Sequence, residues 1–177
     1  MAEIWTVQKI LTWTITFFTS KHVPDARLSA ELLLAHALNC RRIDLYLQFE
    51  RILTPEERAC FREYVTRRAR REPVQYIIGE TEFRGLPLRV SPAVLIPRPE
   101  TELLVDSVWE WVQEMGNRSP VIVDIGTGSG CIAIALAHLL PEAQVWAVEK
   151  SSAALAVARE NAQRHGVNIH FIEGDVF

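Results

Sequence analysis

One ten-residue segment constrains the fold of this chain more than any other. Residues 121–130 read Val-Ile-Val-Asp-Ile-Gly-Thr-Gly-Ser-Gly, and an apolar run follows from Cys131 to Leu140. The apolar start is typical of a buried β-strand, the three glycines of a tight loop, and the apolar run of a helix. A strand, a glycine loop and a helix in this order present backbone N–H groups and a helix N-terminus to a ligand.

The glycine spacing distinguishes between cofactor classes. A dinucleotide-binding loop follows the pattern Gly-x-Gly-x-x-Gly. Here the third glycine, Gly130, comes one residue early, and Cys131 stands where that pattern requires glycine. Asp124 ends the strand, and an acid there suits the ammonium group of an amino-acid moiety better than a pyrophosphate. We therefore interpret the loop as a site for S-adenosylmethionine (SAM).

From Pro99 onward, helical and strand patterns alternate. Strands are expected at about 121–125, 144–148 and 168–172, with helices at about 130–139 and 152–165 between them. Near-continuous apolar strands are typical of a parallel sheet that helices cover on both faces. The fold class expected for this part is α/β. A preceding helix is indicated by apolar residues at helical spacing, namely Leu104, Val108, Trp111 and Met115.

Residues 1–72 are expected to form a helical domain. Pro24 can open a helix, and Thr54-Pro55-Glu56-Glu57 is a capping box that predicts a helix to about Arg70. Threonines at 12, 14 and 16 also suit a strand, although the apolar spacing around them is helical. The helix after Pro24 is expected to bury one face, made of Leu28, Leu32, Ala35 and Leu38.

Residues 73–98 are expected to link this domain to the α/β part at 99–177. Two short alternating runs flank a Gly/Pro turn between Thr81 and Val90, which predicts a β-hairpin. Pro92, Pro97 and Pro99 then prevent regular structure. The segment from Arg98 to Glu102 has two readings, which the sequence leaves equally open. It is either a rigid helix start or a lining of the cofactor entrance.

Composition favours a soluble, cytoplasmic protein. The net charge of −3 argues against nonspecific nucleic-acid binding, and no apolar run is long enough to cross a membrane. Three widely spaced cysteines indicate a reducing compartment and no metal site. The arginines at 67, 68, 70 and 71 are either a solvated helix end or a docking patch for an acidic or nucleic-acid-containing partner.

Two further acids follow the expected strands. Glu149 lies 23 residues after Gly126, about the separation at which an acid accepts hydrogen bonds from ribose hydroxyls. Asp175 could accept from an adenine amino group, with Val176 beside the ring. The alternatives are an exposed acid before a helix for Glu149 and a helix-capping turn residue for Asp175.

Together these motifs resemble the peptide-chain-release-factor glutamine N5-methyltransferases, the PrmC/HemK family. The resemblance rests on Gln75-Tyr-Ile-Ile-Gly79 before Phe83, on Ile96-Pro-Arg-Pro-Glu-Thr-Glu102, and on the glycine loop. It implies a class I, Rossmann-like SAM-dependent methyltransferase domain, of which residues 99–177 are the first half. It also implies methylation of the glutamine in the Gly-Gly-Gln loop of class 1 release factors, with the helical domain helping to dock that partner.

The resemblance also implies roles for individual residues. Glu149 would hold the ribose, where several relatives have aspartate, and Asp175 and Val176 would lie beside the adenine. The methionine part of SAM would be held by Gly126, Thr127, Gly128, Ser129 and Gly130. No metal is implied, and direct nucleic-acid binding and membrane association are not expected.

The family's catalytic Asn-Pro-Pro-Tyr motif has no counterpart in these 177 residues, which contain no Pro-Pro dipeptide. We therefore expect the sequence to be a fragment, assign no catalytic residue, and expect the strand at 121–125 to be an exposed edge. Three alternatives remain. They are a SAM enzyme acting on an amino group of nucleic acid or another protein, a non-catalytic SAM-binding chain, and, least favoured, an NAD enzyme.

Overall fold

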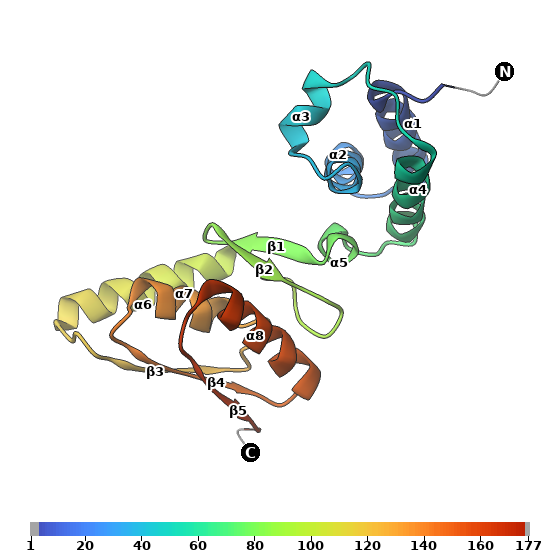
Figure 1. Cartoon of the computed structure of the whole chain (residues 1–177). Coiled ribbons are helices and arrows are strands. Elements are labelled where there is room, and N and C mark those ends of the chain that lie inside the picture. The colour runs from blue at the N-terminus through green and yellow to red at the C-terminus, as the bar shows by residue number, and fades with distance from the viewer. Residues whose placement is uncertain (1–3, 176–177) are drawn as a thin grey trace. The chain divides into compact units, whose positions relative to one another are not determined.

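The computed structural model describes residues 4–175 in two compact units (Figure 1). The first extends to Ile78 and the second begins at Gly79. The division therefore falls inside the segment at 73–98 that the sequence indicates as a linker.

The first unit is helical, as expected. Its helices are α1 (Val7–Ser20), α2 (Ala26–Ala37), α3 (Arg42–Leu47), α4 (Pro55–Ala69) and the short α5 (Val74–Ile78). The threonine-rich stretch belongs to α1 and not to a strand, and the Thr16 hydroxyl donates to the Thr12 carbonyl at 3.1 Å. The capping box is confirmed, because Thr54 Oγ1 accepts from the Glu57 backbone N–H at 3.2 Å and Glu57 Oε2 accepts from that of Thr54 at 2.9 Å.

The buried face predicted for α2 is correct only in part, because Ala35 is buried and Leu32 and Leu38 pack partly buried against the core, but Leu28 does not. Leu28 is 41% exposed, whereas Ala30, Leu33 and Leu34 are fully buried. The helix packs against both α1 and α4, and the positions of these two helices decide which side chains of α2 are buried. The predicted and observed stripes both follow helical spacing, so periodicity alone does not distinguish them.

The arginine cluster at the end of α4 is mostly used inside the unit. Arg67 pairs with Glu72, and Arg71 donates to the carbonyls of the loop after α1. Arg68 donates to Ser29 Oγ and to the carbonyl oxygens of Pro24 and Glu72, each at 3.1 Å. Burial lowers the pKa of this guanidinium. These three arginines therefore tie the end of α4 to the rest of the unit and are not simply solvated.

The second unit begins with the expected hairpin, β1 (Glu80–Phe83) and β2 (Leu86–Arg89). Phe83 and Leu88 are buried with the apolar side chains of the α/β part. The remaining elements are α6 (Glu100–Met115), β3 (Val121–Ile125), α7 (Cys131–Leu139), β4 (Gln144–Glu149), α8 (Ser152–His165) and β5 (His170–Glu173). The three strands form a parallel sheet in the order β3-β4-β5, which confirms the α/β class.

The prediction that helices cover both sheet faces is wrong for the part of the chain that the structure describes. Figure 1 shows α6, α7 and α8 on one side of the sheet. On β3, Val121, Val123 and Ile125 are 54–64% exposed. Parallel crossovers are right-handed. Because β3, β4 and β5 follow one another in one direction, both crossover helices must lie on the same face.

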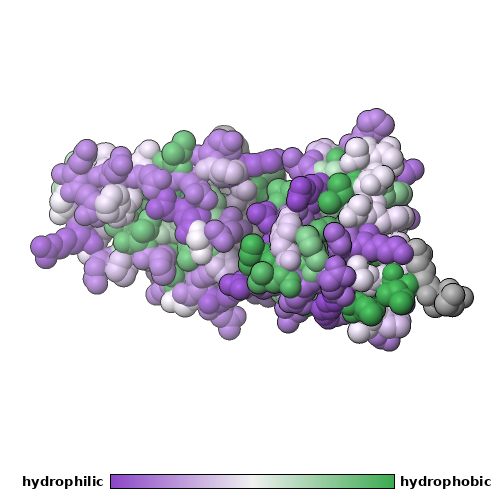
Figure 2. Space-filling model, turned by 90° about the horizontal axis from the view of Figure 1, so that it is seen from above, coloured by the Kyte–Doolittle hydropathy of each residue, from purple (hydrophilic) through white to green (hydrophobic). Residues whose placement is uncertain are grey.

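The helix that Leu104, Val108, Trp111 and Met115 indicated is confirmed as α6, although of these four residues only Val108 packs against the core. Val105 and Val112 are buried, whereas Leu104, Trp111 and Met115 are 51–63% exposed. Figure 2 shows hydrophobic residues interspersed with hydrophilic ones on the face seen from above. Among helices within residues 4–175, none is long and apolar enough to cross a membrane.

Candidate functional site

The glycine loop lies at the carboxyl end of the parallel sheet, between β3 and α7. The backbone N–H groups of Gly126 and Thr127 both donate to the Val148 carbonyl, at 2.8 and 3.1 Å. These bonds fasten the loop to the end of β4. Ligands of open α/β sheets bind outside the carboxyl ends of the strands, so the loop occupies the expected position.

Gly130 is needed for close packing as well as for its backbone angle. Its φ is +82°, and a Cβ there would lie 2.9 Å from Ile134 Cδ1 and 3.2 Å from the Ala158 methyl group. The residue therefore lets the start of α7 approach α8. By contrast, a Cβ at Gly126 would meet nothing within 4 Å, so this side of the loop is open.

Glu149 joins the loop to the next helix. Its Oε2 accepts from the Gly128 N–H and its Oε1 from the Ser151 N–H, both at 3.0 Å. Each carboxylate oxygen can accept more than one hydrogen bond. Both oxygens therefore keep acceptor capacity for a ligand, and the carboxylate is held in a fixed orientation beside the loop.

Asp124 is the last residue but one of β3 and contacts the loop. Its Oδ2 accepts from the Thr127 hydroxyl at 2.6 Å. Burial raises the pKa of the Asp124 carboxyl, and the bond from Thr127 partly opposes this effect. A cationic ligand group beside Asp124 would favour the ionised form and would be attracted by it.

The end of β5 brings a third acid to the same edge. The Gly174 N–H donates to the Glu149 carbonyl at 3.1 Å. The exposed Asp175 pairs through its Oδ2 with Lys150 Nζ at 2.7 Å. Val176 lies outside the described residues, so its predicted place beside an adenine ring stays a prediction.

The predicted loop residues therefore fall into two groups. Gly126 is exposed and Gly128 partly so. The other three are buried, and Thr127 and Ser129 are only 5% and 2% exposed. The Thr127 side chain holds the loop to Asp124, and contact of any of these residues with a ligand stays a prediction.

Sequence reasoning missed Asn161, which is fully buried on α8. Its Nδ2 donates to the carbonyls of Ser129 and Arg89 at 2.9 and 3.0 Å, and its Oδ1 accepts from the Arg89 N–H at 2.7 Å. One side chain thus joins the glycine loop to the end of β2. The sequence contains one sign of this role. Asn161 lies beside Ala158 and Ala162 on an apolar helix stripe, and a buried amide needs hydrogen-bond partners.

The segment at 97–102 begins α6 and is partly committed to structure. Glu102 Oε1 accepts from the Arg84 N–H at 3.0 Å in the hairpin turn, and the Arg84 guanidinium also pairs with Asp106. These bonds favour the helix-start reading for Glu102. The exposed Arg98 and Glu100 do not discriminate between the two readings.

Comparison with known proteins assigns both parts of the chain. Residues 9–79 match the PrmC N-terminal domain and residues 122–177 match a methyltransferase domain. The release factor glutamine methyltransferase of Geobacter sulfurreducens is 49% identical over 178 aligned residues, covering 99% of this chain and 60% of the relative. The corresponding protein of Chlorobaculum tepidum is also 49% identical, covering 98% and 60%.

A human release factor glutamine methyltransferase is 42% identical, covering 89% of this chain and 48% of the relative. The chain thus spans about 60% of the length of the bacterial relatives and about half that of the human one. Among solved structures, a Pyrococcus abyssi tRNA (uracil-54, C5)-methyltransferase overlaps 54% of this chain and 23% of its own, with a TM-score of 0.45 and 20% identity. The α/β fold is therefore established by the parallel strand order β3-β4-β5 of the chain itself.

Proposed function

The chain belongs to the family of release factor glutamine methyltransferases, and from this premise we propose that its second unit binds SAM for methylation of a release factor glutamine. The proposed acceptor is the side-chain amide in the Gly-Gly-Gln loop of class 1 release factors, and the proposed compartment is the cytoplasm. The observation that carries the cofactor proposal is the Glu149 carboxylate, which two backbone N–H groups orient beside the glycine loop.

The hydrogen-bond acceptors at the sheet edge fit SAM. Asp124, Glu149 and Asp175 supply carboxylate oxygens at the ends of three neighbouring parallel strands. SAM offers these acceptors an ammonium group, two ribose hydroxyls and an adenine amino group, all of them donors. A pyrophosphate offers only acceptors and negative charge, which three acids disfavour. The open side of Gly126 leaves room for backbone contact with the methionine part.

The chemistry explains what such a site must do. Bound SAM supplies a methyl group activated by a positively charged sulfur. An amide nitrogen is a poor nucleophile because its lone pair is delocalised into the carbonyl, so orientation and electrostatics must supply much of the rate enhancement. In this proposal residues 4–175 bind and orient the cofactor, and no catalytic residue is assigned among them.

The cofactor proposal is tested by calorimetric titration of SAM into the 177-residue chain. Glu149→Gln keeps one acceptor oxygen and should weaken binding at least about tenfold. Glu142→Gln, an exposed acid before β4, is the matched control and should change nothing. Absence of SAM binding, or equal loss with both variants, would refute the proposal.

The substrate proposal is tested separately with the longest natural form of the protein. Transfer of radiolabelled methyl groups to a class 1 release factor is expected. It should vanish when the glutamine of the acceptor's Gly-Gly-Gln loop is replaced by alanine. Labelling of tRNA or ribosomal RNA in place of the release factor would show that the acceptor is wrong while the cofactor proposal stands.

A further inference from the structure

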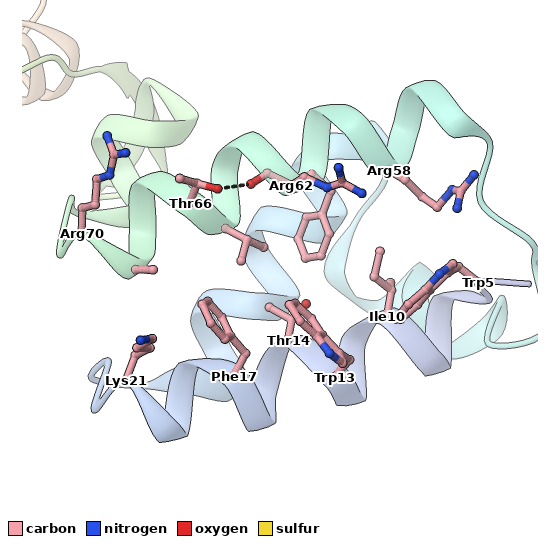
Figure 3. Close-up of a pocket in the computed structure, with 13 residues that line it drawn as sticks. Trp5, Ile10, Trp13, Thr14, Phe17, Lys21, Arg58, Arg62, Thr66 and Arg70 are labelled. Carbon is pink, nitrogen blue, oxygen red and sulfur yellow. Dashed lines mark hydrogen bonds between the residues drawn. The ribbon is translucent and has the colours of Figure 1, made fainter. Parts of the chain in front are cut away.

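The helical unit contains a pocket between α1 and α4 that is not part of the proposed SAM site. Its volume is about 650 Å³, within the size range of functional pockets. Both helices pack on α2, and Figure 3 shows them on opposite sides of the pocket, with Trp13 and Phe17 of α1 pointing toward α4. The pocket is therefore a groove between two helices, with α2 behind it.

The floor of this groove is apolar and aromatic. Phe61 and Val65 of α4 line it and are buried, whereas Trp13 is 51% exposed. The Trp13 and Phe17 rings stack at a centroid distance of 5.3 Å. A half-exposed tryptophan stacked over an apolar floor is the kind of anchor that protein interfaces use.

The rim of the groove is positively charged. Arg58 and Arg62 lie on α4 and Arg70 directly follows it, with spacings of four and eight residues, and Lys21 directly follows α1 on the other side of the groove. No aspartate or glutamate occurs among the described residues that line the groove. Arg62 and Arg70 are exposed. The groove therefore offers positive charge along one edge, with no acid of its own to neutralise it.

Two buried polar atoms in the groove have no hydrogen-bond partner within residues 4–175. They are Thr14 Oγ1 and Arg58 Nε. Thr14 is fully buried, unlike Thr16, whose hydroxyl bonds the carbonyl four residues earlier. Buried polar groups are almost always satisfied in native proteins. These two atoms are therefore the places in the described lining of the groove where a polar partner is lacking.

We propose that this groove docks an acidic amphipathic α-helix of a protein partner. The lining residues extend over α1 and its flanks, from Trp5 to Lys21, and over α4 and its end, from Arg58 to Arg70. This length is roughly 18–24 Å at 1.5 Å per residue, which suits a helix of about 12–16 residues. The apolar side of such a helix would cover the aromatic floor, and its carboxylates would pair with the arginines of the rim.

A synthetic peptide tests the proposal on the full 177-residue chain. The probe is a 14-residue acetylated, dye-labelled helix with leucine on one side and glutamate on both flanks, and binding is followed by fluorescence anisotropy at low salt. Arg62→Glu combined with Arg70→Glu should weaken binding at least about tenfold. Arg118→Glu, an exposed arginine in the second unit, is the charge-matched control and should leave the affinity within about twofold.

A charge swap keeps the test independent of folding. The double variant should bind a peptide in which lysine replaces every glutamate more tightly than the wild-type chain does, and circular dichroism should show unchanged helix content. Dissociation constants above about 1 mM for the acidic peptide, or equal affinity for the acidic and lysine peptides, would overturn the proposal. The oligonucleotide dT12 is a second competitor. If it displaced the bound peptide at a lower concentration than unlabelled peptide does, the groove would be a nucleic-acid site and the proposal would also be overturned.

Discussion

Replacing Asn161 by alanine should destabilise the second unit strongly. The side chain is fully buried and satisfies the Arg89 N–H and the carbonyl oxygens of Arg89 and Ser129, at distances of 2.7 to 3.0 Å. Each buried backbone group left without a partner costs roughly 1–3 kcal/mol. Water entering the space left by the amide would recover part of this loss. We therefore expect Asn161→Ala to lower the free energy of unfolding by about 3–5 kcal/mol.

Hydrogen exchange measured by mass spectrometry is the suitable assay, because the two units need not unfold together. Peptides from β4 and α8 should lose protection in the variant, while peptides from α1 and α2 should not change. Gln163→Ala is the control, since Gln163 is exposed on the same helix, and its effect should stay within about 0.5 kcal/mol. A loss below about 1 kcal/mol for Asn161→Ala would refute the view that this amide holds the glycine loop to the hairpin.

Three further predictions concern the loop and the helical unit. Gly130→Ala should lower the free energy of unfolding by about 2–4 kcal/mol, because the added methyl group meets Ile134 and Ala158 at a positive φ. Gly126→Ala should lower it by only about 1 kcal/mol and should mainly weaken SAM binding. Chemical unfolding measures the first effect and calorimetric titration of SAM the second. Burial raises the pKa of Asp124, so this carboxyl favours the folded state below the ordinary aspartate pKa, and that contribution is lost as pH rises through the raised value. Asp124→Asn should therefore raise the melting temperature near neutral pH, flatten its pH dependence above the ordinary aspartate pKa of about 3.9, and weaken SAM binding; an unchanged pH profile would contradict this. Arg68→Lys should destabilise the first unit by about 1–2 kcal/mol, because an ammonium cannot reach the three acceptors that the guanidinium bridges, while Arg62→Lys should be neutral in the same thermal melts.

The features that the sequence alone determined are local ones. The capping box at Thr54 and Glu57 and the glycine loop after β3 are each encoded by a few contiguous residues whose backbone preferences act within one turn. The limits of α8 matched the prediction for the same reason, since Ser151 caps its start and Gly166 follows its end. Local propensity and periodicity therefore predicted most of the elements and their order, but not the short helices α3 and α5.

The partners of these elements were decided only by the tertiary structure. Periodicity identified only part of the buried stripe of α2, because several stripes of one helix satisfy the same spacing and only the neighbouring elements select one. The bare face of the sheet follows from the handedness of two crossovers that continue in one direction. Asn161 bonds a residue 72 positions away. No local pattern specifies that pairing, because it exists only once the hairpin and α8 have packed together.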